Sequence, residues 1–368
     1  MTAAEIHPPG GDAASGHGPD TGAAASDDRR MLRTVRRIGL ARYLVVTAVL
    51  VTLLVVFAVL ALMLGDRVIA PGDVLAALFG QGSGGDRFVV LGLRLPRLAM
   101  GLMVGVAFGL AGAVFQSLLG NPLASPDIIG ISQGASAAAV GAILVFGLSG
   151  LAVSVAAFAG AILVAALITI LASRNGVAGS RFVLIGIALA FLAQALIQYL
   201  LTRSDVRDAQ SALVWLVGSI GTVPPEELVF TAIGVAVLAL GLALLAPRLR
   251  MLQLGDETAS GLGVRITRTR LLLTLVAVGL AAVATAAVGP IAFVAFVSAP
   301  IARRLLGGTA TALVTSALVG AVVVTGADII AQHALPSLQV PVGIVTGIVG
   351  APILLGLLAR GNRTRGTA

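Results

Sequence analysis

The chain contains no cysteine and no lysine, and all 24 of its basic residues are arginines. Without cysteine it cannot form disulfides, thiolate metal sites or iron–sulfur clusters. Without lysine it cannot contain a P-loop, whose lysine contacts the nucleotide phosphates. Histidine is scarce too, with three residues, and of the sixteen acids only Asp328 lies well inside an apolar run. We therefore expect no catalytic residue, no cofactor, no resident metal and no enzymatic activity of the chain itself.

Charge is scarce along the whole chain. Only 11% of the 368 residues are charged, 58% are apolar, and the mean hydropathy is +1.05. Soluble proteins carry about 25% charged residues and roughly 45–50% apolar ones. Because a membrane-spanning helix needs about 20 apolar residues, this length allows around ten spans. The composition excludes a water-soluble enzyme and predicts an all-α, polytopic protein of the lipid bilayer.

The two ends of the chain differ from the middle. Residues 1–28 are rich in Gly, Pro, Ala, Ser and Asp and lack apolar periodicity. Such a composition cannot bury enough surface to order itself, so we expect residues 1–40 to form a disordered cytoplasmic tail. They do not resemble a secretory signal, because no arginine precedes the apolar run within residues 1–28. A transmembrane domain is predicted for residues 41–361 and a short cytoplasmic tail for 362–368.

Hydropathy divides the middle of the chain into ten predicted spans. The eighth is short, and Pro290 just before it and Pro300 within it are expected to break its helical hydrogen bonding. The predicted spans are 41–64, 96–119, 126–146, 151–172, 182–201, 228–245, 271–288, 291–306, 312–331 and 342–358.

The arginines indicate the orientation. Cytoplasmic loops carry an excess of Lys and Arg. With ten spans and a cytoplasmic N-terminus, eighteen arginines fall inside and six outside, so the sequence predicts a plasma-membrane protein with both termini in the cytoplasm. The net charge of +8 follows this membrane pattern, so no nucleic-acid partner is expected. The six outer residues are Arg67, Arg87, Arg94, Arg97, Arg203 and Arg207.

One short segment occurs twice. Leu91-Gly-Leu-Arg-Leu-Pro-Arg97 is similar to Leu262-Gly-Val-Arg-Ile-Thr-Arg268, and each precedes a predicted span. Five spans separate the two, which puts them on opposite membrane faces, as an inverted repeat requires. Small residues also recur at helical spacing, which predicts close helix packing. These are Gly101, Gly105, Gly109 and Gly112 in the second span and Gly343, Gly347 and Gly350 in the tenth.

The connection after the second span is polar, with Gln116-Ser-Leu-Leu-Gly-Asn-Pro-Leu-Ala-Ser-Pro-Asp127 followed by Ile129-Gly-Ile-Ser-Gln-Gly-Ala135. Ser125 suits an N-cap with Pro126 at the first helical position, so we expect the third helix to start there. Polar residues at membrane depth usually face a cavity or another helix. A translocation path and simple helix packing are both open for these residues. The path candidates are Gln116, Asn121, Ser132, Gln133 and Asp328.

Three further motifs each have two interpretations. Residues 248–268 form a cytoplasmic loop, in which a short helix could enter a groove on a partner, or which could be a solvated linker. Arg94 and Arg97 could bind carboxylates of an outer partner or contact lipid headgroups. Gly147-Leu-Ser-Gly150 matches the short pattern of rhomboid proteases, with His333 as a conceivable base, but four residues match readily by chance.

Several motifs in order resemble the FecCD family of permease subunits, which serve type II ABC importers of ferric siderophores, haem and cobalamin. The resemblance covers about residues 41–360. Its motifs include Leu93–Arg97, Asn121–Pro126, Gly130–Ala135, Gly255–Gly263, Gly289–Val294, Ile301–Arg304, Ala327-Asp328, Pro341–Ile344 and Gly350–Pro352.

The resemblance implies a fold of about ten helices, with spans 2–5 and 7–10 related as an inverted repeat, and two permease subunits that form a homodimer or a homologous heterodimer. It implies ATP-binding-cassette ATPase subunits as cytoplasmic partners and an extracytoplasmic substrate-binding protein that docks on Arg94 and Arg97. The expected ATPase-coupling residues are Gly255, Asp256, Glu257, Ala259, Leu262 and Gly263.

The implied substrate is a ferric siderophore, carried by alternating access, with cobalamin or haem as alternatives. Val214–Ser219 and Arg303-Arg304 are most similar to siderophore permeases of the ferric-enterobactin type. Two positions depart from the family pattern. Gln332 stands where many members have a third docking arginine, and Ala299-Pro300 replaces the usual pair before the Ile-Ala-Arg motif, which shifts the expected helix bend by one residue.

Overall fold

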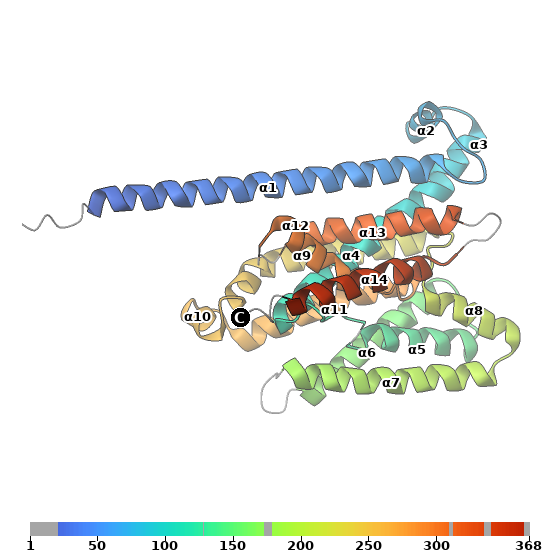
Figure 1. Cartoon of the computed structure of the whole chain (residues 1–368). Helices are drawn as coiled ribbons and strands as arrows, with labels where there is room; N and C mark the ends of the chain where they lie inside the picture. Colours follow the sequence, from blue (N-terminus) through green and yellow to red (C-terminus); the bar gives the residue numbers. More distant parts are fainter. Residues whose placement is uncertain (1–20, 128, 173–178, 309–311, 335–339, 364–368) are drawn as a thin grey trace, which may run out of the picture. The chain divides into compact units, whose positions relative to one another are not determined.

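The computed structural model of the chain describes residues 21–127, 129–172, 179–308, 312–334 and 340–363, and these are helical apart from turns and connections. The chain divides within its first helix into two units, at Val45 and Val46. The second unit contains every site considered below. The helices (Figure 1) are α1 (Thr21–Met63), α2 (Pro71–Leu78), α3 (Gly84–Arg87), a π-helix (Phe88–Arg94), α4 (Leu95–Leu119), α5 (Ile131–Leu144), α6 (Leu151–Ala172), α7 (Gly179–Arg203), α8 (Val206–Val217), α9 (Pro225–Leu252), α10 (Asp256–Gly261), α11 (Ile266–Val288), α12 (Val294–Leu306), α13 (Leu313–His333) and α14 (Val342–Arg363).

Each of the ten predicted spans coincides with a helix. Seven helical segments are long and apolar enough to cross a membrane, and α5 and α14 contribute shorter apolar ones. The remaining predicted span, the eighth, corresponds to α12, which has 13 residues. The all-α, multi-pass architecture is confirmed. The seven long segments are 36–63, 84–119, 151–172, 183–203, 225–252, 266–288 and 313–333.

Several predicted boundaries are wrong. α1 begins at Thr21, so the tail predicted as disordered over residues 1–40 is helical from residue 21 onward, while residues 1–20 lie outside the described part. Residues 29–42 contain mostly Arg, Leu, Met and Ala, which favour helix, and extending the first span toward them requires no new nucleation. At the other end α14 continues to Arg363, and residues 364–368 lie outside the described part.

The third span begins five residues later than predicted. Residues around Pro126 form turns, and α5 starts at Ile131 after Gly130, whose φ is 86°. Ser125 therefore does not cap this helix. The eighth span is also different from the prediction, because α12 continues through Pro300 without interruption. Sequence analysis also missed α2 and the amphipathic α8.

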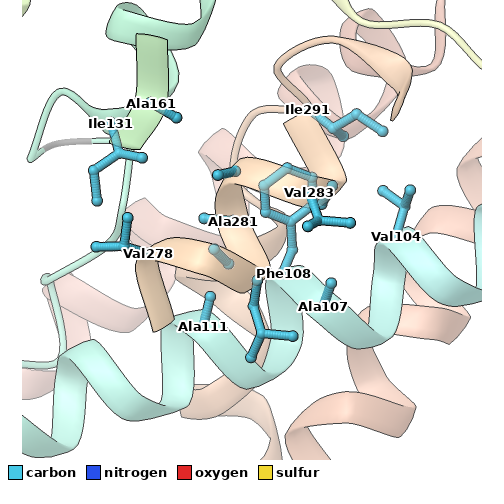
Figure 2. Close-up of a cluster of buried hydrophobic side chains, with 14 of the residues drawn as sticks. Val104, Ala107, Phe108, Ala111, Ile131, Ala161, Val278, Ala281, Val283 and Ile291 are labelled. Atoms are coloured by element: carbon cyan, nitrogen blue, oxygen red, sulfur yellow. The ribbon is translucent and has the colours of Figure 1, made fainter. Parts of the chain in front are cut away.

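The core is built from small residues on α4 and α11. Figure 2 shows Ala107, Phe108 and Ala111 of α4 close to Ala281 and Val283 of α11, and all five side chains are buried. The small side chains of Ala107, Ala111 and Ala281 let the two helix axes approach closely, and Phe108 fills the space beside them.

The glycine stripe of α4 packs against two other helices, as its packing interpretation predicted. A Cβ on Gly105 would lie 2.5 Å from the Gly320 carbonyl oxygen of α13, and a Cβ on Gly109 would clash with the Ser316 carbonyl of the same helix. One turn further, Gly112 faces the backbone of Ala295 in α12. In α14 Gly350 packs on Phe293, whereas a Cβ on Gly347 would meet nothing within 4 Å.

The order of elements from α4 to α7 recurs from α11 to α14. Each series has a long buried helix, then a break at a residue with positive φ, and then a short helix. The residue with positive φ is Gly130 before α5 and Phe293 (φ 67°) before α12. The backbone before α5 packs on Gly186 of α7, and Phe293 packs on Gly350 of α14. Likewise α4 packs on α13 and α11 packs on α6. This correspondence agrees with the predicted repeat.

Candidate functional site

The side chain of Arg97 is bound within the chain. Its Nη2 donates to Asp328 Oδ1 of α13 at 2.8 Å, and its Nε lies 3.2 Å from both carboxylate oxygens. The Gln332 amide donates to Asp328 Oδ2 at 2.8 Å. Asp328 is buried and the Arg97 side chain is 19% exposed. Arg97, predicted to dock an outer partner, and Asp328, predicted to line a path, therefore form one ion pair between α4 and α13.

Arg94 has a different role from Arg97. Its guanidinium donates to the carbonyls of Leu62, Met63 and Arg67, at 2.7, 2.9 and 2.6 Å. The first two are among the last carbonyls of α1, which have no partner inside the helix. Arg94 thus caps the C-terminus of α1. The two arginines do not form one joint surface for carboxylates, although they stand three residues apart.

Gln116 joins α4 to α12 in the core. Its Nε2 donates to the Phe296 carbonyl at 2.9 Å, and its Oε1 accepts from Arg303. Gln116 is 3% exposed. Pro300, four residues after Phe296, has no N–H and cannot satisfy this carbonyl. Gln116 therefore supplies the hydrogen bond that the proline removes.

The other path candidates lie in or just after the α4–α5 connection. Asn121 is exposed, and its Oδ1 accepts from the Leu123 amide at 2.9 Å, which stabilises a turn. Ser132 is buried and donates to Asp127 Oδ1 at 2.5 Å. Loss of hydration raises the pKa of Asp127 to about 6, against the lowering effect of the Ser132 hydrogen bond. Gln133 is half-buried in the first turn of α5.

The short helix expected in the cytoplasmic loop is α10. Gly255 (φ 99°) precedes it and Gly263 (φ 83°) follows it. The Val264 amide donates to the Ala259 carbonyl and the Gly263 amide to the Ser260 carbonyl, both within 3.0 Å. This is a Schellman motif, with Gly263 at its left-handed position. A Cβ at either glycine would meet nothing within 4 Å, so close packing does not require glycine here. The positive φ angles require it, because other residues rarely adopt them.

The exposed surface of this turn carries two leucines beside two acidic residues. Leu254 and Leu262 are 63% and 57% exposed, whereas Ala259 is buried against the neighbouring helices. Asp256 forms an exposed ion pair with Arg270 of α11 at 2.8 Å, and Glu257 is exposed beside it. The residues predicted for coupling therefore lie together on α10 and in its flanking turns.

Sequence reasoning missed Arg303 and the Phe296 carbonyl, which complete the buried contact of Gln116. The available signal was Pro300, because a proline inside a buried helix leaves a carbonyl that some donor must satisfy. Across the part of the chain that the structure describes, no group of three or more His, Asp and Glu residues is placed to hold a metal ion.

Together these features define a multi-pass α-helical membrane protein with polar contacts between its spans and a short helix, α10, flanked by two exposed leucines. Residues 53–360 match the model of the FecCD transport family, and the chain belongs to this family.

Its relatives cover nearly all of the chain. The ferric enterobactin transport system permease protein FepG of Escherichia coli is 38% identical over 324 residues, which are 88% of this chain and 98% of that protein. The Fe(3+)-citrate import system permease protein YfmE of Bacillus subtilis is 37% identical over 86% of this chain and 95% of that protein. A solved structure described as an inward-facing metal-chelate type ABC transporter superimposes with a TM-score of 0.77 at 29% identity, over 86% of this chain and 99% of that one.

Proposed function

We propose that the chain is the membrane-embedded permease subunit of an ABC importer that carries a ferric siderophore by alternating access. The observation that carries this proposal is the match to the FecCD transport family over residues 53–360, with relatives named for ferric chelate transport. The partners would be ATP-binding-cassette ATPase subunits, an extracytoplasmic substrate-binding protein and a second permease subunit. Both termini would lie in the cytoplasm.

In this proposal α10 and its flanking glycines couple the permease to the ATPase. The exposed Leu254 and Leu262 give the turn an apolar surface suited to a groove on a partner. Its fixed shape, set by Gly255 and Gly263, would transmit ATP-driven movement to α9 and α11, which it joins.

Arg97 is the stronger candidate for docking the binding protein, because Arg94 is engaged with three backbone carbonyls. A carboxylate of the binding protein would share or replace Asp328 as the partner of Arg97. Gln332, at the position of a third family arginine, contacts Asp328 and adds no charge for docking.

No covalent chemistry is assigned to the chain. The remote alternative was a serine protease with Ser149 as the nucleophile and His333 as the base. Ser149 lies between α5 and α6, while His333 ends α13 and its Nδ1 lies 2.9 Å from the Ile329 carbonyl oxygen. Cobalamin and haem remain alternative substrates of the same mechanism.

Uptake of radiolabelled iron, offered as several ferric siderophores, tests the proposal in cells that make the chain with its partner subunits. Wild type should restore uptake of one chelate class to cells that lack the gene. Gly263→Val should abolish uptake while ATP hydrolysis by the complex continues, because valine cannot readily adopt the positive φ. Gly261→Ala is the matched control, with an ordinary helical φ and open space, and should transport normally. Iron uptake that is independent of the gene for every chelate would overturn the siderophore assignment.

A further inference from the structure

A cavity of about 470 Å³ lies beside α8, where the ends of α5 and α11 meet the starts of α6 and α9. Polar and apolar groups share its wall about equally. Its polar groups are two carboxylates, from Asp208 and Glu227, one indole, from Trp215, and the hydroxyl groups of Ser149, Ser154, Ser211, Ser219 and Thr222. None of the contacts described above for Arg97, Gln116 or α10 lies in this wall.

The charge of the cavity is of one sign. Two of its lining residues are acidic and none of them is arginine or histidine. Glu227 is half-buried, and among the described residues its carboxylate has no hydrogen-bond or ion-pair partner. Its Oε1 lies over Gly150, 3.8 Å from where a Cβ would stand. The Glu227 carboxylate is therefore free to accept hydrogen bonds from a group that enters the cavity.

The position of Glu227 in the first turn of α9 accounts for only part of this arrangement. An acid there is favoured by the helix dipole, and Glu226 satisfies the same preference. Glu227 cannot close a capping box, because the residue before the helix is Pro224, which has no N–H to offer. The dipole therefore explains an acid in this turn but not one that faces the cavity.

Ser154 gives an independent indication of a ligand. It is only 5% exposed and lines the cavity, yet no hydrogen-bond partner of its hydroxyl is found in the described part of the chain. Buried serines in helices usually bond the carbonyl four residues earlier. The Ser154 hydroxyl makes no such bond to the Gly150 carbonyl, so it is available to a group inside the cavity.

We propose that this cavity binds an organic cation, a guanidinium or a primary ammonium group. Carboxylates accept charge-assisted hydrogen bonds from such groups, serine hydroxyls accept further ones, and the face of an indole attracts a cation. A metal ion alone fits less well, because only two carboxylates are available and the space is much larger than one ion. The cation is either a free small molecule or an Arg or Lys side chain of the docked binding protein, and the second source rests on the proposed function.

Trp215 allows a direct test, because it is the only tryptophan in the chain. The purified full chain in lipid nanodiscs is titrated with methylguanidinium chloride, with sodium chloride as the ionic-strength control, and tryptophan fluorescence is followed. Wild type should show a saturable change. Glu227→Gln should weaken the affinity by about tenfold or more, the loss expected for one charge-assisted hydrogen bond.

Glu226→Gln is the matched control, because it removes the same charge from the same helical turn but does not line the cavity. It should bind as wild type does. Ser154→Ala provides a second variant with little effect on folding and should bind several-fold more weakly. No saturable change in wild type, or an equal loss in Glu226→Gln and Glu227→Gln, would overturn the proposal.

A second arm identifies the source of the cation. The affinity of the permease for its binding protein is measured with and without saturating methylguanidinium. A decrease in wild type that is absent in Glu227→Gln assigns the cavity to a side chain of the binding protein. An unchanged affinity assigns it to a free cation. If no binding protein associates at all, the proposed function fails, while the fluorescence result is unaffected.

Discussion

Replacing Gln116 by methionine should destabilise the protein through one buried carbonyl. Methionine nearly conserves the volume but cannot donate to the Phe296 carbonyl, which Gln116 now binds at 2.9 Å. Pro300 offers no N–H, so the carbonyl would remain unsatisfied in the core, at a cost of about 1–3 kcal/mol. Arg303 would also lose an acceptor, worth about 1 kcal/mol. We therefore expect Gln116→Met to lower the unfolding free energy by about 2–4 kcal/mol.

Pro300→Ala supplies the missing donor and isolates this effect. An alanine at this position restores the backbone N–H that α12 needs to satisfy the Phe296 carbonyl. In that background Gln116→Met should cost about 1–3 kcal/mol less, because only the Arg303 contact is lost. Thermal unfolding of the four purified proteins in one detergent measures this coupling. Equal losses in the two backgrounds would refute the reasoning.

Two further predictions concern other contacts of α4. Asp328→Asn should cost about 1–3 kcal/mol in wild type but much less in an Arg97→Gln background, since the buried pair is lost only once. Thermal unfolding of the single and double variants checks this, and additive losses would contradict it. Gly105→Val should cost about 1–3 kcal/mol or more, because its Cβ would press on the Gly320 carbonyl. Gly347→Ala, with open space around it, should change stability by less than about 0.5 kcal/mol, and equal shifts in the unfolding midpoint would argue against close packing at Gly105.

The spans and their packing stripes could be predicted because both depend on local properties. Any run of about 20 apolar residues must become helical in a bilayer, and glycines at i and i+4 necessarily share one face of a helix. The start of α5 was misplaced for a related reason. Ser125 and Pro126 carry genuine helix-start preferences, but tertiary packing holds the next residues as turns until Gly130.

The polar contacts could not be predicted, because each joins residues far apart in the sequence. Arg97 and Asp328 are separated by 231 positions, and Gln116 and Arg303 by 187. The residue types were recognised as unusual for a membrane interior, but their partners depend on how α4 packs against α12 and α13. Sequence analysis therefore assigned Arg97 to a docking partner and Gln116 and Asp328 to a path, and gave Arg303 no site role.

The glycine and polar contacts of α4 connect it tightly to both α12 and α13. Glycine contacts hold the middle of α4, and a polar contact stands near each end, Arg97 with Asp328 and Gln116 with Arg303. Arg97 and Gln116 are nineteen residues apart, which is about 28 Å along a helix, close to the thickness of the hydrocarbon core, about 30 Å. An alternating-access movement that broke either contact would expose a buried charge or carbonyl. We therefore expect α4, α12 and α13 to move together, and the change of access to occur at their contacts with the remaining helices.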